Sequence, residues 1–131
     1  SDLEGAFGSL PGAISKGSAK FSDLAAAKGL DASGPYVGES YDAAAIIALA
    51  IQAGGYADKQ SILSNIKKVS NAPGLIINPG QLSYGLQMLA AGKDIDYQGA
   101  TDVEFNAFGD ANGAFKELEV SGGTFVTVGA L

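Results

Sequence analysis

The stretch FGDANGAFKELE, residues 108–119, holds the residue types of a calcium-binding loop. Asp110 and Asn112 precede Gly113, and a glutamate stands six positions after it. An EF-hand loop needs oxygen ligands at positions 1, 3, 5 and 12, with glycine at position 6. Position 1 then falls on Phe108, whose side chain has no oxygen to offer. The sequence therefore favours a hairpin turn, in which Asn112–Gly113 supplies the positive φ of a tight connection.

Two further groups of residues have types that could carry catalysis. Ser64 and Lys67 have the S-x-x-K spacing of hydrolases that pair a serine with a lysine, but no S-D-N or K-T-G segment follows them. Asp94, Asp96 and Glu104 could be paired carboxylates for acid–base work, but nothing near them supplies a nucleophile. We expect a solvated helix face around Ser64 and acidic surface strands, and we predict no catalytic residues and no enzyme activity.

Tyr36 stands immediately before an apolar helical segment, among the small residues Gly34, Pro35 and Gly38. These neighbours leave an aromatic ring room to face outward. An aromatic side chain at the start of a helix can form a stacking surface for a ligand. Packing of the ring in the core is the alternative, and the residues alone leave both open.

Four segments have helical patterns and must position these side chains: 18–29, 41–55, 57–70 and 79–93. The second has no polar face between Ala43 and Ile51, so we expect it to be covered on most sides at the centre of the core. Residues expected inside are Ile46, Ile47, Leu49 and Ile51, together with Ile62, Leu63, Ile66 and Val69 on one face of the third helix. Asp58 is expected to cap the third helix.

Short β-rich segments stand at both ends of the chain. Residues 3–10 predict one strand, and after Gly92 the segments DIDYQG, DVEFN, AFKELEV and TFVTVGAL are divided by glycines. This order fits an α/β or α+β fold. The parallel sheet that an α/β domain needs is only partly represented, so the sequence predicts part of a fold.

The composition excludes several classes of function. The chain has 131 residues, no cysteine, no histidine and a formal net charge of −6. Zinc sites of the usual kind, thiol nucleophiles and disulfides are thereby excluded, and we expect no metal or other cofactor. An acidic chain without a basic stripe does not suit nucleic acid or an anionic membrane surface. No signal peptide is visible, so we expect a mature protein, a cytoplasmic one or a piece of something longer.

Three segments in order carry a family resemblance: YVGESYDAAAIIALAIQAGG, SILSNIKKVSNAPG and LQMLAAGKDIDYQGATDVEFNAFGDANGAFKELEV. Together they resemble the C-terminal part of the type I periplasmic solute-binding proteins, in particular the branched-chain amino-acid-binding group that serves ABC transporters. The likeness covers nearly the whole chain. The sequence departs from the family at Asn106, where an aspartate is more usual.

The resemblance implies that residues 1–131 are the C-terminal portion of a two-lobe α/β fold, with helices on a partial sheet followed by short strands. Residues 12–100 would belong to the first lobe, and residues 101–131 would form hinge and crossover strands. It also implies a periplasmic protein that holds an amino acid or related small molecule between its lobes and delivers it to an ABC transporter permease. A sensory receptor domain with the same fold is the alternative.

The resemblance also indicates which ligand contacts this chain would supply. The groups that hold the ligand's carboxylate and ammonium in this family would lie in a missing N-terminal part of the same protein. Of the family's ligand-contacting positions, only the aromatic before the Tyr-Asp-Ala helix falls within this chain, on Tyr36. Tyr36 is therefore the predicted ligand-binding residue.

Overall fold

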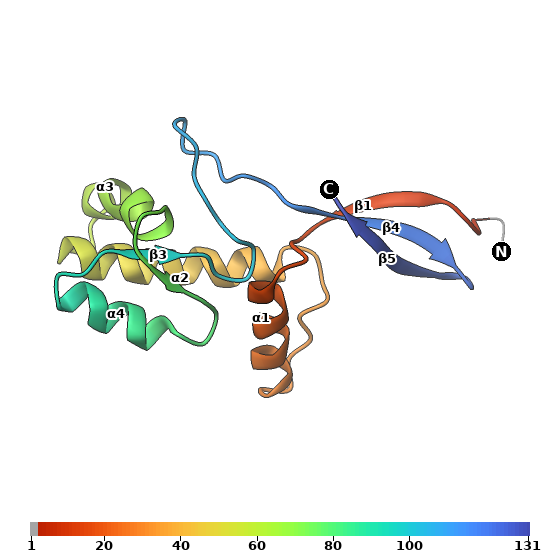
Figure 1. The fold of residues 1–131 in the computed structure, drawn as a ribbon, viewed down its shortest axis with the longest axis horizontal. Coiled ribbons are helices and arrows are strands. Elements are labelled where there is room, and N and C mark those ends of the chain that lie inside the picture. The colour runs from red at the N-terminus through yellow and green to blue at the C-terminus, as the bar shows by residue number, and fades with distance from the viewer. Residues whose placement is uncertain (1–2) are drawn as a thin grey trace.

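A computed structural model describes residues 3–131, and within them the chain forms four helices and five strands (Figure 1). In chain order these are β1 (Phe7–Pro11), α1 (Lys16–Ala26), α2 (Val37–Gly54), α3 (Lys59–Ser70), β2 (Leu75–Ile77), α4 (Leu82–Ala90), β3 (Ile95–Tyr97), β4 (Phe115–Ser121) and β5 (Thr124–Ala130). The predicted mixture of helices and strands is confirmed at this level, although β2 lies between α3 and α4.

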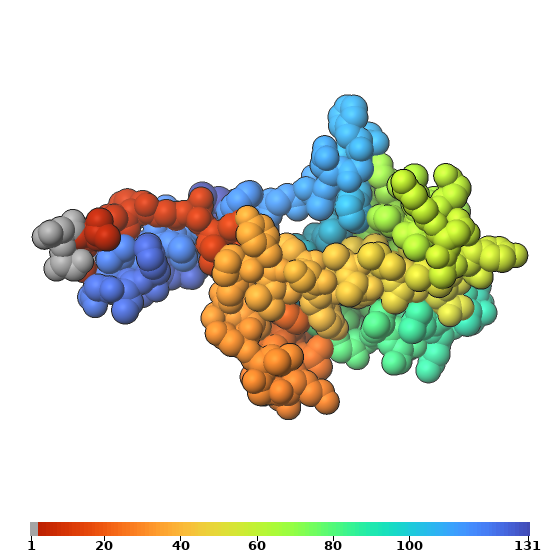
Figure 2. Space-filling view, turned by 180° about the vertical axis from the view of Figure 1, so that it is seen from behind, coloured from red at the N-terminus to blue at the C-terminus, as the bar shows by residue number. Residues whose placement is uncertain are grey.

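The strands form two separate sheets. β1, β4 and β5 make an antiparallel sheet in the order β1-β4-β5, and β2 pairs with β3 in parallel. Figure 1 shows the antiparallel sheet projecting from one end of a body made by the helices and the parallel pair. Figure 2 shows the same arrangement from behind, with the segment between β3 and β4 rising above the helical body beside α3. The chain thus has a helical body and a projecting sheet.

The core of the helical body lies where α2, α3 and α4 meet the parallel pair. Its fully buried members come from α2, α3, β2 and β3: Leu49, Ala50, Val69, Ile77, Ile95 and Tyr97. Gly85 lets α4 approach closely, because a Cβ atom there would lie 3.0 Å from Leu49 and 3.3 Å from Ile77. The predicted central role of the second helix is confirmed by Leu49, which is fully buried.

One edge of the parallel pair is open. The Leu75 amide donates to the carbonyl of Asp94 (3.0 Å), and the Ile77 carbonyl accepts from the Gln98 amide (3.1 Å). Since backbone groups alternate along a strand, those of Ile76 point away from β3. The side chains of Leu75 and Ile76 are 43% and 53% exposed. Parallel strands are normally covered on both faces. Here β2 is the last strand of the sheet, and its apolar side chains are partly in solvent.

Several helix ends form as predicted. Asp58 caps α3 by accepting a hydrogen bond from the Ser61 amide (3.0 Å), and Gly55 ends α2 at φ 75°. The capping box of Ser15 and Ser18, which starts α1, was not predicted. The side chains of Ser15 and Asp58 accept hydrogen bonds from amides at the helix starts, which have no partner within the helix.

Three expectations about the core and its helices are wrong. Ile47 is 45% exposed, because it belongs to one face of α2, with Ser40, Ala43 and Ala44, that stays uncovered. Figure 1 shows α3 and α4 on either side of α2. Leu63 is 62% exposed, because it follows Ile62 directly and so points about 100° away from the buried face. Helix α4 begins at Leu82, because residues 78–81 form a turn in which the Gln81 side chain accepts from the Asn78 amide.

The acidic segment is a turn, but its geometry differs from the prediction. The positive φ falls on Gly109 (93°), and Gly113 has none. Asn106 builds the turn, because its side-chain oxygen accepts from the amides of Phe108 (2.8 Å) and Asp110 (3.1 Å). The segment DVEFN forms no strand: one isolated bridge, from Phe105 to Ala111, closes the loop.

Candidate functional site

Tyr36 occupies an unusual backbone position. It is the N-cap of α2 in the left-handed region, at φ 62° and ψ 8°, and its side chain makes no capping hydrogen bond. The side chain is 61% exposed, so the ring is not packed in the core of residues 3–131. A bulky side chain at positive φ is a genuine outlier and costs on the order of 1–2 kcal/mol. The fold therefore keeps this ring exposed despite the conformational cost.

Tyr36 lines a groove of about 310 Å³, which we call the Tyr36 groove. Its walls come from β1, the start of α2, the turn after β3 and the approach to β4: Pro11, Ala13, Tyr36, Glu39, Thr101, Val103, Ala111, Asn112, Gly113, Ala114 and Phe115. The groove thus lies at the junction of the helical body and the projecting sheet. A concave site of this volume is at the small end of the range for small-molecule pockets.

The turns that follow β2 and β3 lie against the start of α2, which bears the groove. The Gly80 amide, after β2, donates to the Tyr41 hydroxyl (3.2 Å). Thr101, after β3, is bound to α2 and lines the groove itself. In open α/β sheets, ligands bind outside the carboxyl ends of the strands. The Tyr36 groove lies beside this end of the parallel pair.

A buried carboxylate fixes one wall of the groove. Asp42, in α2, is 2% exposed and accepts hydrogen bonds from the amide of Ala100 (2.8 Å), the amide and hydroxyl of Thr101 (2.9 and 2.8 Å) and the hydroxyl of Tyr97 (2.8 Å). Burial raises the pKa of Asp42, while its hydrogen bonds from Ala100, Thr101 and Tyr97 act against that rise. Asp42 thereby ties the turn after β3 to the first turns of α2.

The Tyr97 hydroxyl is the donor from within β3. Burial, and then the neighbouring Asp42 carboxylate, raise the pKa of Tyr97 far above its ordinary value, so the hydroxyl keeps its proton. The residue patterns alone did not predict this arrangement. The available signal was an aspartate in an otherwise apolar helix, YDAAAIIALA, because a buried charge needs dedicated hydrogen-bonding partners.

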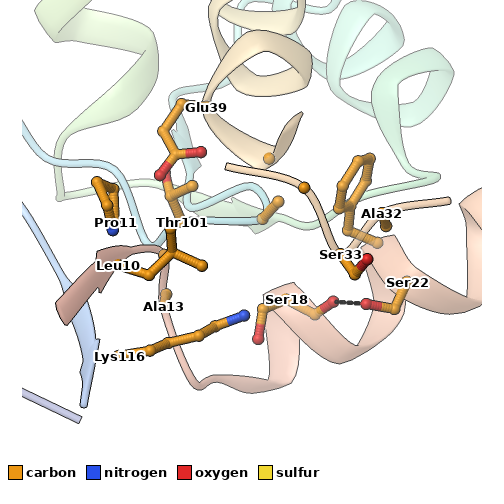
Figure 3. Close-up of a pocket in the computed structure, with 15 residues that line it drawn as sticks. Leu10, Pro11, Ala13, Ser18, Ser22, Ala32, Ser33, Glu39, Thr101 and Lys116 are labelled. Atoms are coloured by element: carbon orange, nitrogen blue, oxygen red, sulfur yellow. Dashed lines mark hydrogen bonds between the residues drawn. The ribbon is translucent and has the colours of Figure 1, made fainter. Parts of the chain in front are cut away.

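A smaller cavity of about 50 Å³ adjoins the groove and shares four of its residues: Pro11, Ala13, Glu39 and Thr101. Figure 3 shows Glu39 and Lys116 on different sides of this cavity, with Ser18, Ser22 and Ser33 also at its wall. Within residues 3–131, the side chains of Glu39 and Lys116 form no ion pair and no hydrogen bond. Two opposite charges therefore stand near the groove without neutralising each other by contact.

The serine–lysine pair does not form a catalytic dyad. Ser64 is exposed, and its hydroxyl donates to the Gln60 carbonyl (2.9 Å) within the same helix. Lys67 instead donates to the carbonyl of Asn106, at the base of the loop between β3 and β4. The prediction of a solvated helix face at Ser64 is confirmed.

The three carboxylates are not brought together as an acid–base site. Asp96 is buried and accepts from the Gln98 side chain (3.3 Å), whereas Asp94 and Glu104 are exposed. Asp96 and Glu104 border a separate open cavity, and Asp94 borders another. Among residues 3–131, no group of three or more acidic side chains is arranged to hold a metal ion.

No helix in the described part of the chain has both the length and the hydropathy to cross a bilayer. Comparison of the chain with descriptions of protein families, with curated proteins and with solved structures finds no match in any of the three. The resemblance to solute-binding proteins, and the ligand-binding role of Tyr36, therefore stay predictions.

Proposed function

We propose that this chain is the C-terminal part of a type I periplasmic solute-binding protein and that the Tyr36 groove forms part of its ligand cleft. The ligand is an amino acid or related small molecule, captured between two lobes and delivered to an ABC transporter permease. An N-terminal part of the same protein, outside residues 1–131, completes the cleft.

The position of the groove is the observation that carries the proposal. Pro11 and Phe115, in the projecting sheet, line it together with Tyr36 and Thr101, in the helical body. A relative movement of the two parts would change the groove directly. Hinged closure around a ligand works in this way, because the ligand binds the closed arrangement more tightly than the open one.

The open edge of β2 supports the same proposal. A two-stranded parallel sheet with an apolar edge lacks the neighbours that parallel strands normally have. Additional strands from an N-terminal part would cover Leu75 and Ile76 and extend the sheet. The strained backbone of Tyr36 agrees with a binding role, because such strain clusters at functional sites.

The test uses the longer protein that contains this chain, and isothermal titration with each of the common amino acids. We expect one or a few to bind, and Tyr36→Ala to weaken that binding by more than about tenfold with little change in melting temperature. Tyr56→Ala is the matched control, because Tyr56 is 72% exposed and borders none of the described cavities.

Two results would contradict the proposal. If Tyr36→Ala lowers stability and leaves affinity unchanged, the ring has a structural role. If the isolated 131-residue chain binds an amino acid with micromolar affinity, the missing part is not needed for the site.

A further inference from the structure

We infer that the part of the ligand that enters the Tyr36 groove carries a positive charge. The inference rests on the proposed function, because it takes the groove to be part of the ligand cleft. The chemical class that this chain selects is an organic cation with an ammonium, quaternary ammonium or guanidinium group.

The charge of the groove comes from Glu39. Among the eleven residues that line the groove, Glu39 is the one acidic residue and none is basic. Its side chain is half-buried, and no other side chain of residues 3–131 forms an ion pair or hydrogen bond with it. A carboxylate that is partly withdrawn from water and has no side-chain partner among residues 3–131 attracts a cationic group.

Two aromatic rings reinforce this preference. Tyr36 and Phe115 line the same groove and are 61% and 41% exposed. The face of an aromatic ring carries partial negative charge and attracts ammonium and guanidinium groups. A carboxylate with two exposed rings in one groove is a combination suited to an organic cation.

Lys116 does not cancel this charge by contact. It borders the adjoining small cavity and is absent from the lining of the groove. Its methylene groups lie over Gly12, where a Cβ atom would stand 3.3 Å from Cε. A cation bound beside Tyr36 would therefore approach Glu39 from the groove, on a path that Lys116 does not line.

The experiment uses isothermal titration of the longer protein with three pairs of probes of similar shape that differ in one positive charge. L-arginine and L-citrulline differ in a distal cation, choline and 3,3-dimethylbutan-1-ol in a quaternary ammonium, and L-leucine and 4-methylpentanoate in the α-ammonium. In at least one pair we expect the member with the additional positive charge to bind about tenfold or more tightly than the other. The pair whose discrimination is lost in Glu39→Gln identifies the cation that enters the groove.

Variants show whether the difference in affinity between the members of a pair depends on the groove. Glu39→Gln is expected to weaken binding of the preferred cation by about tenfold or more and to leave its partner within about twofold. Glu119→Gln is the matched control, because it removes the same charge from a half-buried glutamate of β4 that borders none of the described cavities. Tyr36→Phe should retain cation affinity within about threefold, and Tyr36→Ala should lose it.

The outcomes separate this inference from the proposed function. If probes bind and Tyr36→Ala weakens them, but charge makes no difference in any pair or Glu39→Gln behaves like Glu119→Gln, the inference is overturned and solute binding stands. If neither these probes nor the common amino acids bind, both are overturned.

Discussion

At the scale of single residues, Asp42 links the backbone turn after β3 to α2. A buried charge is costly unless hydrogen bonds replace the water it has lost. Here the donors are the amides of Ala100 and Thr101 and the hydroxyls of Thr101 and Tyr97. Removing the carboxylate would leave buried donors without an acceptor, and that loss costs more than the net value of the bonds themselves.

We therefore predict that Asp42→Ala lowers the free energy of unfolding by about 3–5 kcal/mol, measured by urea denaturation of the chain. Tyr97→Phe removes one donor together with its bond and should cost only about 1 kcal/mol. In the Asp42→Ala background the cost of Tyr97→Phe should shrink, because the two groups interact. Additive effects of the two substitutions would contradict the described arrangement.

At the scale of secondary-structure elements, close approach of backbones decides where α1 lies. Gly17 is buried near the start of α1, and a Cβ atom there would lie 2.1 Å from the carbonyl oxygen of Gly99. The turn after β3 thus contacts α1 through Gly17 and α2 through Asp42.

Gly17→Ala tests this contact against helix propensity. Alanine is favoured over glycine within a helix by about 1 kcal/mol, but the clash with a backbone oxygen cannot be relieved by a side-chain rotation. We predict that Gly17→Ala lowers the free energy of unfolding by about 1–3 kcal/mol in chemical denaturation. Ser22→Ala, on the exposed side of the same helix, should change it by less than about 0.5 kcal/mol. A more stable Gly17→Ala variant would exclude the close approach.

The sequence predicted the helices well because their signals are local. Asp58, the Gly54–Gly55 pair and the apolar run of α2 each act within a few residues. β2 was missed because three apolar residues show no periodicity. Residues 102–106 were wrongly predicted as a strand, because alternation alone does not reveal whether a partner strand is present.

The candidate site was predictable only in part, for the same reason. Tyr36 was selected from its neighbours and its position before α2, and it does lie exposed at a groove. Other parts of the wall come from Pro11 and Phe115, which tertiary structure brings to the same groove as Tyr36. No spacing in the sequence places those residues together. Glu39 becomes a candidate contact for a cation only because the tertiary structure places it in the same groove.

At the scale of the whole molecule, the helical body exposes an unpaired strand edge. An exposed apolar edge favours pairing with another chain, and lysine on such an edge discourages it. We predict that the isolated chain associates as its concentration rises, measured by sedimentation velocity, and that Ile76→Lys weakens the association about tenfold or more. Leu63→Lys removes an apolar side chain of α3 that is 62% exposed, against 53% for Ile76, and that lies away from the edge. If it acts as strongly as Ile76→Lys, general apolar surface and not the edge drives the association.

The left-handed backbone of Tyr36 has a consequence for how this position changes over time. Glycine, and to a lesser degree asparagine, adopts that conformation at lower cost. In a lineage that no longer uses the ring, selection for stability alone would replace the tyrosine by one of these two residues. The residue found here in descendants of the same ancestor would therefore record which lineages still depend on the aromatic side chain.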